Sequence, residues 1–115
     1  MSEANEQKIV MEWAKLHEDK YFCLRWLHAI PNGGSRNKIE AANLKKQGVK
    51  AGICDLFLPY PYKEYAGLYI EMKYGKNKLS EYQEQFIDFA ARSGYKTAVC
   101  YTADEAIKAI KEYLL

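Results

Sequence analysis

The hydrophobic positions of the chain follow two spacings, one typical of helices and the other typical of strands. Apolar side chains that recur every three or four residues predict helices over 4–17 and 80–92, and a final helix that opens at Thr102. A basic segment over 36–47, with Gly48 as its C-cap, predicts a fourth helix. Runs rich in aromatic and β-branched residues predict four strands, at residues 21–30, 53–58, 68–73 and 95–101.

The resulting order of elements is α-β-α-β-β-α-β-α. Helices that alternate with strands in this way indicate an α/β fold, with a mixed central sheet flanked by helices on its faces. The chain has 115 residues and 49% hydrophobic content, which suffices for one domain with its own core. Because the sequence contains no repeat, low-complexity tract or linker, we expect a single domain over residues 1–115.

Charged residues in the two central predicted strands are the first indication of a functional site. Side chains alternate along a strand, so Glu71 and Lys73 share one face while the apolar residues around them take the other. The break between the strands is short enough for a hairpin, which would bring Asp55 near the level of Glu71. Buried carboxylates and an ammonium are costly unless something pairs or binds them, and a divalent metal with a phosphodiester would do so.

Basic residues gather in two segments that flank these carboxylates. Residues 33–50 contain five lysines or arginines and one acid, and residues 73–78 contain three lysines and no acid. The net charge of +2 carries little information by itself, but this distribution suits a polyanionic substrate. Lysines on solvated loops explain either cluster equally well.

The three cysteines, at wide spacing, argue against a disulfide framework or a zinc site. Buried, reduced thiols are typical of an intracellular protein. The sequence has no signal peptide and no apolar run near 18 residues. We therefore expect a soluble cytoplasmic protein with no membrane partner.

Ordered motifs cover nearly the whole chain and resemble those of one nuclease family. The motifs are IPNGGSR at 30–36, LKKQGVKAGICD at 44–55, LYIEMK at 68–73, and SEYQ at 80–83 followed by Gly94-Tyr95. Together with an acid on the first helix, they resemble the VRR-NUC branch of the PD-(D/E)XK nuclease superfamily. Cys54 stands where that family usually has proline, which shapes the backbone before Asp55 but binds no metal.

This resemblance implies a restriction-endonuclease-like three-layer core and a metal-dependent DNA endonuclease. Mg²⁺, for which Mn²⁺ would substitute, can activate water and neutralise charge during phosphodiester hydrolysis. Asp55 and Glu71 are the expected carboxylate ligands, and the resemblance adds the backbone carbonyl of Met72. Lys73 would orient or deprotonate the attacking water, or stabilise the phosphate.

The resemblance also assigns roles to two residues on helices. Glu6 matches the family's helix acid and would bind the metal directly or through water, with Glu3 as a competitor for that role. The helix dipole alone also favours an acid in a first turn. Gln83 matches the family's glutamine and would position substrate or Lys73, although the third position of a capping box favours Gln for a structural reason too.

Four further residues are candidates for substrate binding, namely Asn32, Arg36, Lys45 and Lys46. Turn chemistry alone explains an Asn-Gly pair, so the assignment of Asn32 has a structural alternative. The tyrosines at 60, 62, 65 and 69 could stack on bases or form a partner surface.

The resemblance implies a homodimer, often phage-encoded, that cleaves branched DNA such as Holliday junctions. A catalytically silent DNA-binding module and an RNA-cleaving nuclease with the same site remain as alternatives, because nothing in the sequence distinguishes the sugar of the substrate.

Overall fold

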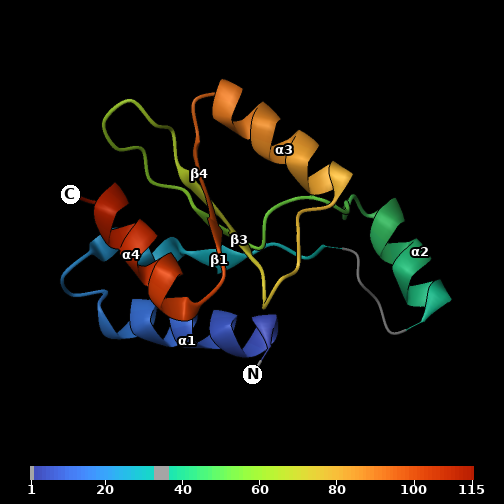
Figure 1. Ribbon diagram of the computed structural model, residues 1–115, viewed down its shortest axis with the longest axis horizontal. Helices are drawn as coiled ribbons and strands as arrows, with labels where there is room; N and C mark the ends of the chain where they lie inside the picture. The colour runs from blue at the N-terminus through green and yellow to red at the C-terminus, as the bar shows by residue number, and fades with distance from the viewer. Residues whose placement is uncertain (1, 33–36) are drawn as a thin grey trace.

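A mixed four-stranded sheet forms the centre of the computed structural model, which describes residues 2–32 and 37–115 (Figure 1). The helices of the described residues are α1 (Glu3–Leu16), the 3₁₀ helix η1 (Phe22–Trp26), α2 (Lys38–Lys46), α3 (Glu81–Arg92) and α4 (Ala103–Tyr113). The strands are β1 (His28–Ala29), β2 (Leu56–Leu58), β3 (Leu68–Met72) and β4 (Lys96–Cys100).

The strands lie in the order in which they occur in the chain. β1 pairs antiparallel with β2, and β2 pairs antiparallel with β3, so the two central strands form the predicted hairpin. β3 and β4 are parallel, which requires a crossover, and α3 supplies it. The sheet is therefore mixed, as the order of predicted elements indicated.

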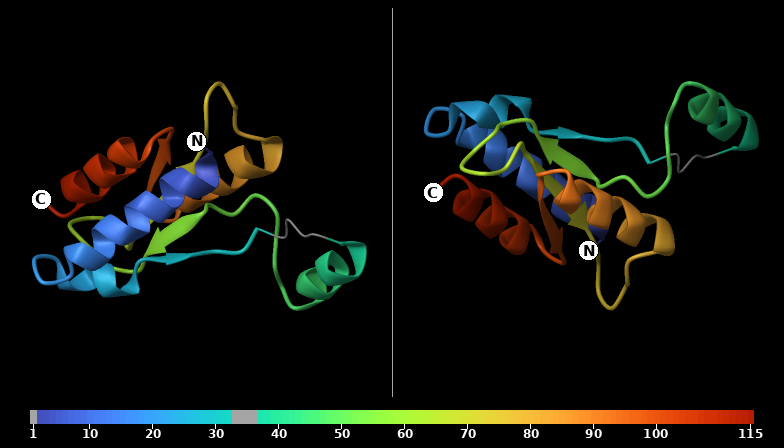
Figure 2. Two further views of the ribbon diagram at one scale, coloured as in Figure 1. Left: turned by 90° about the horizontal axis from the view of Figure 1, so that it is seen from below. Right: turned by 90° about the horizontal axis from the view of Figure 1, so that it is seen from above.

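Helices cover both faces of the sheet (Figure 2). Leu56, Leu58, Leu68 and Ile70 point to one face, where they pack into the core with residues of α1 and α4. The opposite face carries an aromatic pair of Phe57 and Tyr69, and Tyr69 contacts Phe86 of α3 edge to face. The predicted three-layer, restriction-endonuclease-like arrangement is confirmed.

The predicted strand at 21–30 is wrong over most of its length. Residues 22–26 form η1, and strand pairing is limited to His28 and Ala29. Leu24 and Leu27 are buried while Phe22 and Trp26 are exposed. Burial at a spacing of three residues suits a 3₁₀ helix, and the segment lacks the strict alternation that a half-buried strand needs.

α2 stands to one side of the sheet in all views (Figures 1 and 2). The side chain of Asn37 caps its first turn by accepting from the N–H of Glu40, and Gln47 is its C-cap. Gly48 follows with φ of +104°, the left-handed conformation that commonly ends a helix. No residue of Lys38–Lys46 is buried.

None of the helices in residues 2–32 and 37–115 combines the length and the apolar character needed to cross a membrane.

Candidate active site

The hairpin register brings Asp55 and Glu71 together. Leu56 pairs with Ile70, so the next step along the antiparallel register sets Asp55 opposite Glu71. Both side chains point to the face that α3 covers, because they continue the alternation of Phe57 and Tyr69. The proximity expected from the sequence is therefore present.

Backbone contacts hold Asp55 where β2 begins. Its Oδ2 accepts a hydrogen bond of 2.7 Å from the backbone N–H of Met72 on the neighbouring strand. Its own backbone carbonyl accepts from the N–H of Ile30, which continues the pairing with β1. Burial raises the pKa of the Asp55 carboxyl, and the Met72 N–H opposes that shift by stabilising the charged form.

Glu71 has the carboxyl whose pKa is shifted furthest in this group. Its exposed fraction is 2%. Burial, followed by repulsion from Asp55, raises its pKa to about 8, while the Lys73 ammonium opposes the shift. Its Oε1 is buried and has no hydrogen-bond partner among the described residues. A buried carboxylate oxygen of this kind is costly unless a cation or proton satisfies it.

Lys73 lies on the same face, directly after β3. It is buried, and its Nζ lies 3.9 Å from Oε2 of Glu71. Its backbone N–H donates to the carbonyl of Cys100, which extends the β3–β4 pairing past Met72. The sheet therefore holds the Lys73 backbone rigidly beside the carboxylate pair.

Gln83 reaches this group from the first turn of α3. Its Nε2 donates to Oε2 of Glu71 at 3.1 Å. Its Oε1 accepts from the N–H of Ser80 at 2.9 Å, and Ser80 Oγ accepts from the N–H of Gln83, so the predicted capping box forms. The predicted capping role of Gln83 is therefore present, and the same amide also contacts Glu71, while its role towards substrate or Lys73 stays a prediction.

Gly52 belongs to the motif at 44–55, but the sequence assigned it no role of its own. It has φ of +90°, and a Cβ placed on it would lie 2.7 Å from the Cβ of Tyr82. The loop before Asp55 therefore packs directly against the first turn of α3. Only glycine allows this approach, which brings the turn that carries Gln83 next to the loop that carries Asp55.

Two acids of α1 lie in different surroundings. Oε1 of Glu6 accepts from the N–H of Ala103 at 2.9 Å, at the N-terminus of α4, and the side chain is buried. An anion is stabilised there by the helix dipole. Glu3 contributes to raising the pKa of both Asp55 and Glu71 through its negative charge, and its Oε2 accepts from Nδ2 of Asn77 at 3.3 Å.

The donor set fits a hard divalent cation. The pair of carboxylates offers oxygen ligands, and the unpaired Oε1 of Glu71 is an acceptor that a cation would satisfy. Within residues 2–32 and 37–115 no group of three His, Cys, Asp or Glu side chains is clustered tightly enough to hold a metal. A cation held here would keep several waters as ligands, because the cluster offers two carboxylates.

Three of the four candidate substrate-binding residues lie outside this cluster, namely Asn32, Lys45 and Lys46. Lys45 and Lys46 are exposed in the last turn of α2. Asn32 is exposed in the loop after β1, and Arg36 lies outside the described residues. The structure therefore gathers Asp55, Glu71, Lys73 and Gln83, whereas Asn32, Lys45 and Lys46 lie on other segments.

Comparisons with known proteins identify a family and a similar fold. The family model described as "VRR-NUC domain" matches residues 1–104. A solved structure described as "VRR_NUC domain protein" is similar with a TM-score of 0.82 and 30% sequence identity, covering 99% of this chain and 88% of that chain. No curated protein matches the chain.

Proposed function

The chain belongs to the VRR-NUC domain family of nucleases, and from that premise we propose that it is an Mg²⁺-dependent endonuclease that hydrolyses phosphodiester bonds in DNA. The observation that carries the proposal is the cluster of Asp55, Glu71 and Lys73 on one face of the sheet, with Gln83 bonded to Glu71. Mn²⁺ would substitute for Mg²⁺, because both accept oxygen ligands.

In this proposal the chain holds and orients the reacting groups. Asp55, Glu71 and the carbonyl of Met72 would hold the cation, which supplies Lewis acidity and lowers the pKa of water when bound. Asp55 is held by the Met72 N–H and Glu71 by the Gln83 amide, so neither carboxylate has to reorganise. Lys73 would direct its ammonium at the attacking water or at the phosphate.

Glu3 and Glu6 are the two candidates for the family's acid on the first helix. We assign it to Glu3, whose charge acts on both Asp55 and Glu71. Glu6 is the alternative: its Oε1 accepts from Ala103, while its Oε2 is buried and has no hydrogen-bond partner among the described residues. The two assignments make opposite predictions for single substitutions.

Branched DNA, such as a Holliday junction, is the substrate that we propose, acted on by a homodimer. A two-fold dimer would present two sites to two strands, which suits paired cuts. Lys45 and Lys46 of α2, with Asn32 and Arg36 of the preceding loop, would contact the phosphates of the arms. We further propose that the enzyme acts inside the cell, and a phage origin is compatible with this role.

The direct test is cleavage of labelled four-way-junction, flap, linear duplex and single-stranded DNA, and of matched RNA, with Mg²⁺, Mn²⁺ or EDTA. Metal-dependent cutting that is lost in Asp55→Asn and Lys73→Ala supports the proposal, and the preferred substrate identifies the role. Tight binding without cutting would indicate a silent DNA-binding module. Preferential cutting of RNA would indicate the same chemistry on the other nucleic acid.

A further inference from the structure

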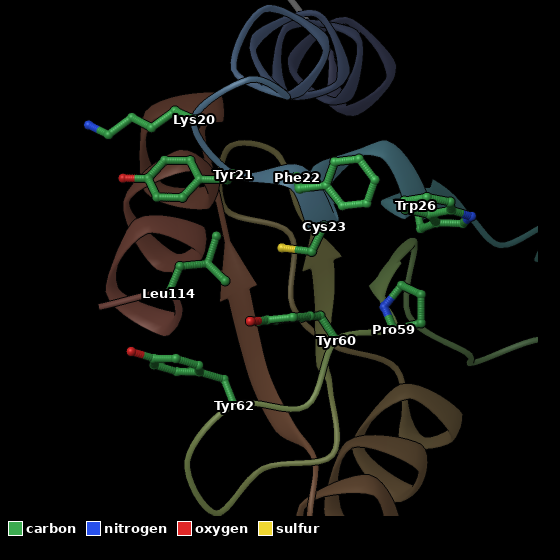
Figure 3. Close-up of a pocket in the computed structure, with 9 residues that line it drawn as sticks. All are labelled: Lys20, Tyr21, Phe22, Cys23, Trp26, Pro59, Tyr60, Tyr62 and Leu114. Atoms are coloured by element: carbon green, nitrogen blue, oxygen red, sulfur yellow. The ribbon is translucent and has the colours of Figure 1, made fainter.

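A pocket of about 610 Å³ lies at the end of β2 that is remote from Asp55. η1 forms one wall, the segment after β2 forms another, and the end of α4 closes one side (Figure 3). In this view the thiol of Cys23 points into the space, with Leu114 and Tyr60 on either side. The volume falls in the range of small-molecule sites, roughly 300–1,000 Å³.

Aromatic rings are the dominant feature of this pocket, contributed by Tyr21, Phe22, Trp26, Tyr60 and Tyr62. Phe22 has an exposed fraction of 66% and Trp26 of 54%. Grouped, exposed rings of this size on one face mark a binding surface.

Cations accompany the rings. The guanidinium of Arg25 lies 5.3 Å from the centre of the Phe22 ring and 5.6 Å from that of Trp26. Nζ of Lys20 lies 5.3 Å from the Tyr21 ring, and Nζ of Lys63 lies 5.6 Å from the Tyr62 ring. The wall segments 20–26 and 59–63 contain these three cations, and Asp19 and Glu64 directly adjoin the segments. The combination favours a ligand with flat rings and negative charge.

Bases and phosphates together have these properties. Aromatic side chains that stack on bases, beside a positively charged track for the backbone, are the usual composition of single-strand binding sites. A protein partner would also use aromatic rings, but three cations that lie over rings of the wall segments suit an anionic ligand better.

The pocket and the carboxylates lie at opposite ends of β2 and on different faces of the sheet. Asp55 precedes β2 and points to the face that α3 covers. The pocket borders the segment after β2 and the end of α4, which packs on the other face. A nucleic acid in the pocket would therefore contact the protein at a surface separate from the carboxylates.

We propose that this aromatic pocket binds unpaired nucleotides of the nucleic-acid substrate, with bases stacked on Phe22, Trp26 and Tyr60 and phosphates beside Lys20 and Arg25. The proposal rests on the proposed function only in taking the substrate to be a nucleic acid. On this proposal the enzyme favours a substrate that carries a single-stranded arm.

The test measures binding of a fluorescein-labelled 12-nucleotide oligothymidylate by anisotropy in EDTA, so that cleavage does not contribute. Trp26→Ala and Phe22→Ala are compared with Phe89→Ala, an exposed phenylalanine on α3 whose exposed fraction is also 66%. We expect the affinity to fall about tenfold in the two pocket variants and to stay unchanged in Phe89→Ala. Quenching of tryptophan emission by the oligonucleotide should disappear with Trp26→Ala.

The molecular mass of each variant, measured by analytical ultracentrifugation, distinguishes a nucleic acid from another copy of this chain as the occupant of the pocket. A loss of affinity at unchanged molecular mass supports the proposal. Unchanged affinity, or a loss that accompanies dissociation of a dimer, overturns it, and the second result assigns the pocket to another copy of this chain. A wild-type protein that cuts duplex DNA but does not bind the oligonucleotide refutes this inference alone. A protein that neither cuts nor binds any nucleic acid refutes the proposed function as well.

Discussion

The side-chain amide of Gln83 donates from Nε2 to Oε2 of Glu71, while its Oε1 accepts from the N–H of Ser80. A backbone N–H can only donate, so the contact with Ser80 fixes which end of the amide faces Glu71. The first turn of α3 thereby sets the position of a carboxylate on β3.

Replacing Gln83 by Glu should separate capping from catalysis. Glutamate is accepted at the third position of a capping box, so the free energy of unfolding should change by less than about 1 kcal/mol. Its carboxylate would replace the donor that faces Glu71, and we expect cleavage to fall about tenfold or more. Urea unfolding and initial cleavage rates provide the two measurements.

Gln85→Glu is the matched control, because Gln85 is exposed on the same helix and the charge change is identical. Equal cleavage rates in the two variants would contradict a positioning role for Gln83.

Gly52→Ala should disturb the contact with Tyr82. The added Cβ would clash with the Cβ of Tyr82, and the positive φ disfavours a side chain by about 1–2 kcal/mol. We expect a lower melting temperature and a lower cleavage rate, because the turn that carries Gln83 must shift. Gly48→Ala carries a similar positive φ but meets nothing within 4 Å. It should therefore lose stability without a comparable loss of activity, and equal losses of activity would refute the steric explanation.

The metal-free protein should lose stability as the pH rises from about 5 to about 8. The folded-state pKa of Glu71, about 8, exceeds its ordinary value of 4.5, so the folded state binds more protons than the unfolded state between these values. The free energy of unfolding therefore decreases with rising pH in this window. Thermal melts in EDTA should record a fall of several degrees, since about 1 kcal/mol corresponds to roughly 4–8 °C.

Glu71→Gln should remove most of that pH dependence and raise the melting temperature at pH 8, because the buried charge is absent. If the melting temperature depends on pH equally strongly in Glu71→Gln, a group other than Glu71 titrates in this range.

Lys73→Ala should lower the cleavage rate by about 10²–10⁴-fold, the usual contribution of a proton-transferring or charge-stabilising group. Binding of Mn²⁺, followed by calorimetry, should persist because both carboxylates remain. Lys76→Ala changes an exposed lysine three residues later and should leave cleavage nearly unchanged. Retention of activity within about threefold in Lys73→Ala would exclude a chemical role.

Substitution of Glu6 should mainly affect stability, whereas substitution of Glu3 should mainly affect the metal requirement of cleavage. Glu6→Gln should lower the free energy of unfolding by about 0.5–2 kcal/mol, because it weakens the charge-assisted bond to the N-terminus of α4. Glu3→Gln should instead raise the Mg²⁺ concentration needed for half-maximal cleavage. A metal requirement that changes only in Glu6→Gln would reverse the assignment.

The sequence predicted those parts of the fold and site that depend on local patterns. The hairpin put Asp55 opposite Glu71 because short strands joined by a short break pair with each other, and Ser80 with Gln83 gave the start of α3. Contacts between distant segments, such as Gly52 with Tyr82 and Glu3 with Asn77, have no local pattern and could not be predicted. Residues 21–30 were misassigned because their apolar content resembles a strand although their burial follows a spacing of three.

The isolation of α2 has a thermodynamic consequence for substrate recognition. Helices shorter than about 12–15 residues are marginal in water unless packing supports them, and these nine residues bury no side chain. Amide hydrogens of α2 should therefore exchange faster than those of α1 or α4. If Lys45 and Lys46 bind phosphates, association would also have to pay for ordering this helix. The affinity for the arms of the substrate would then depend on the intrinsic helix propensity of α2 as well as on its charge.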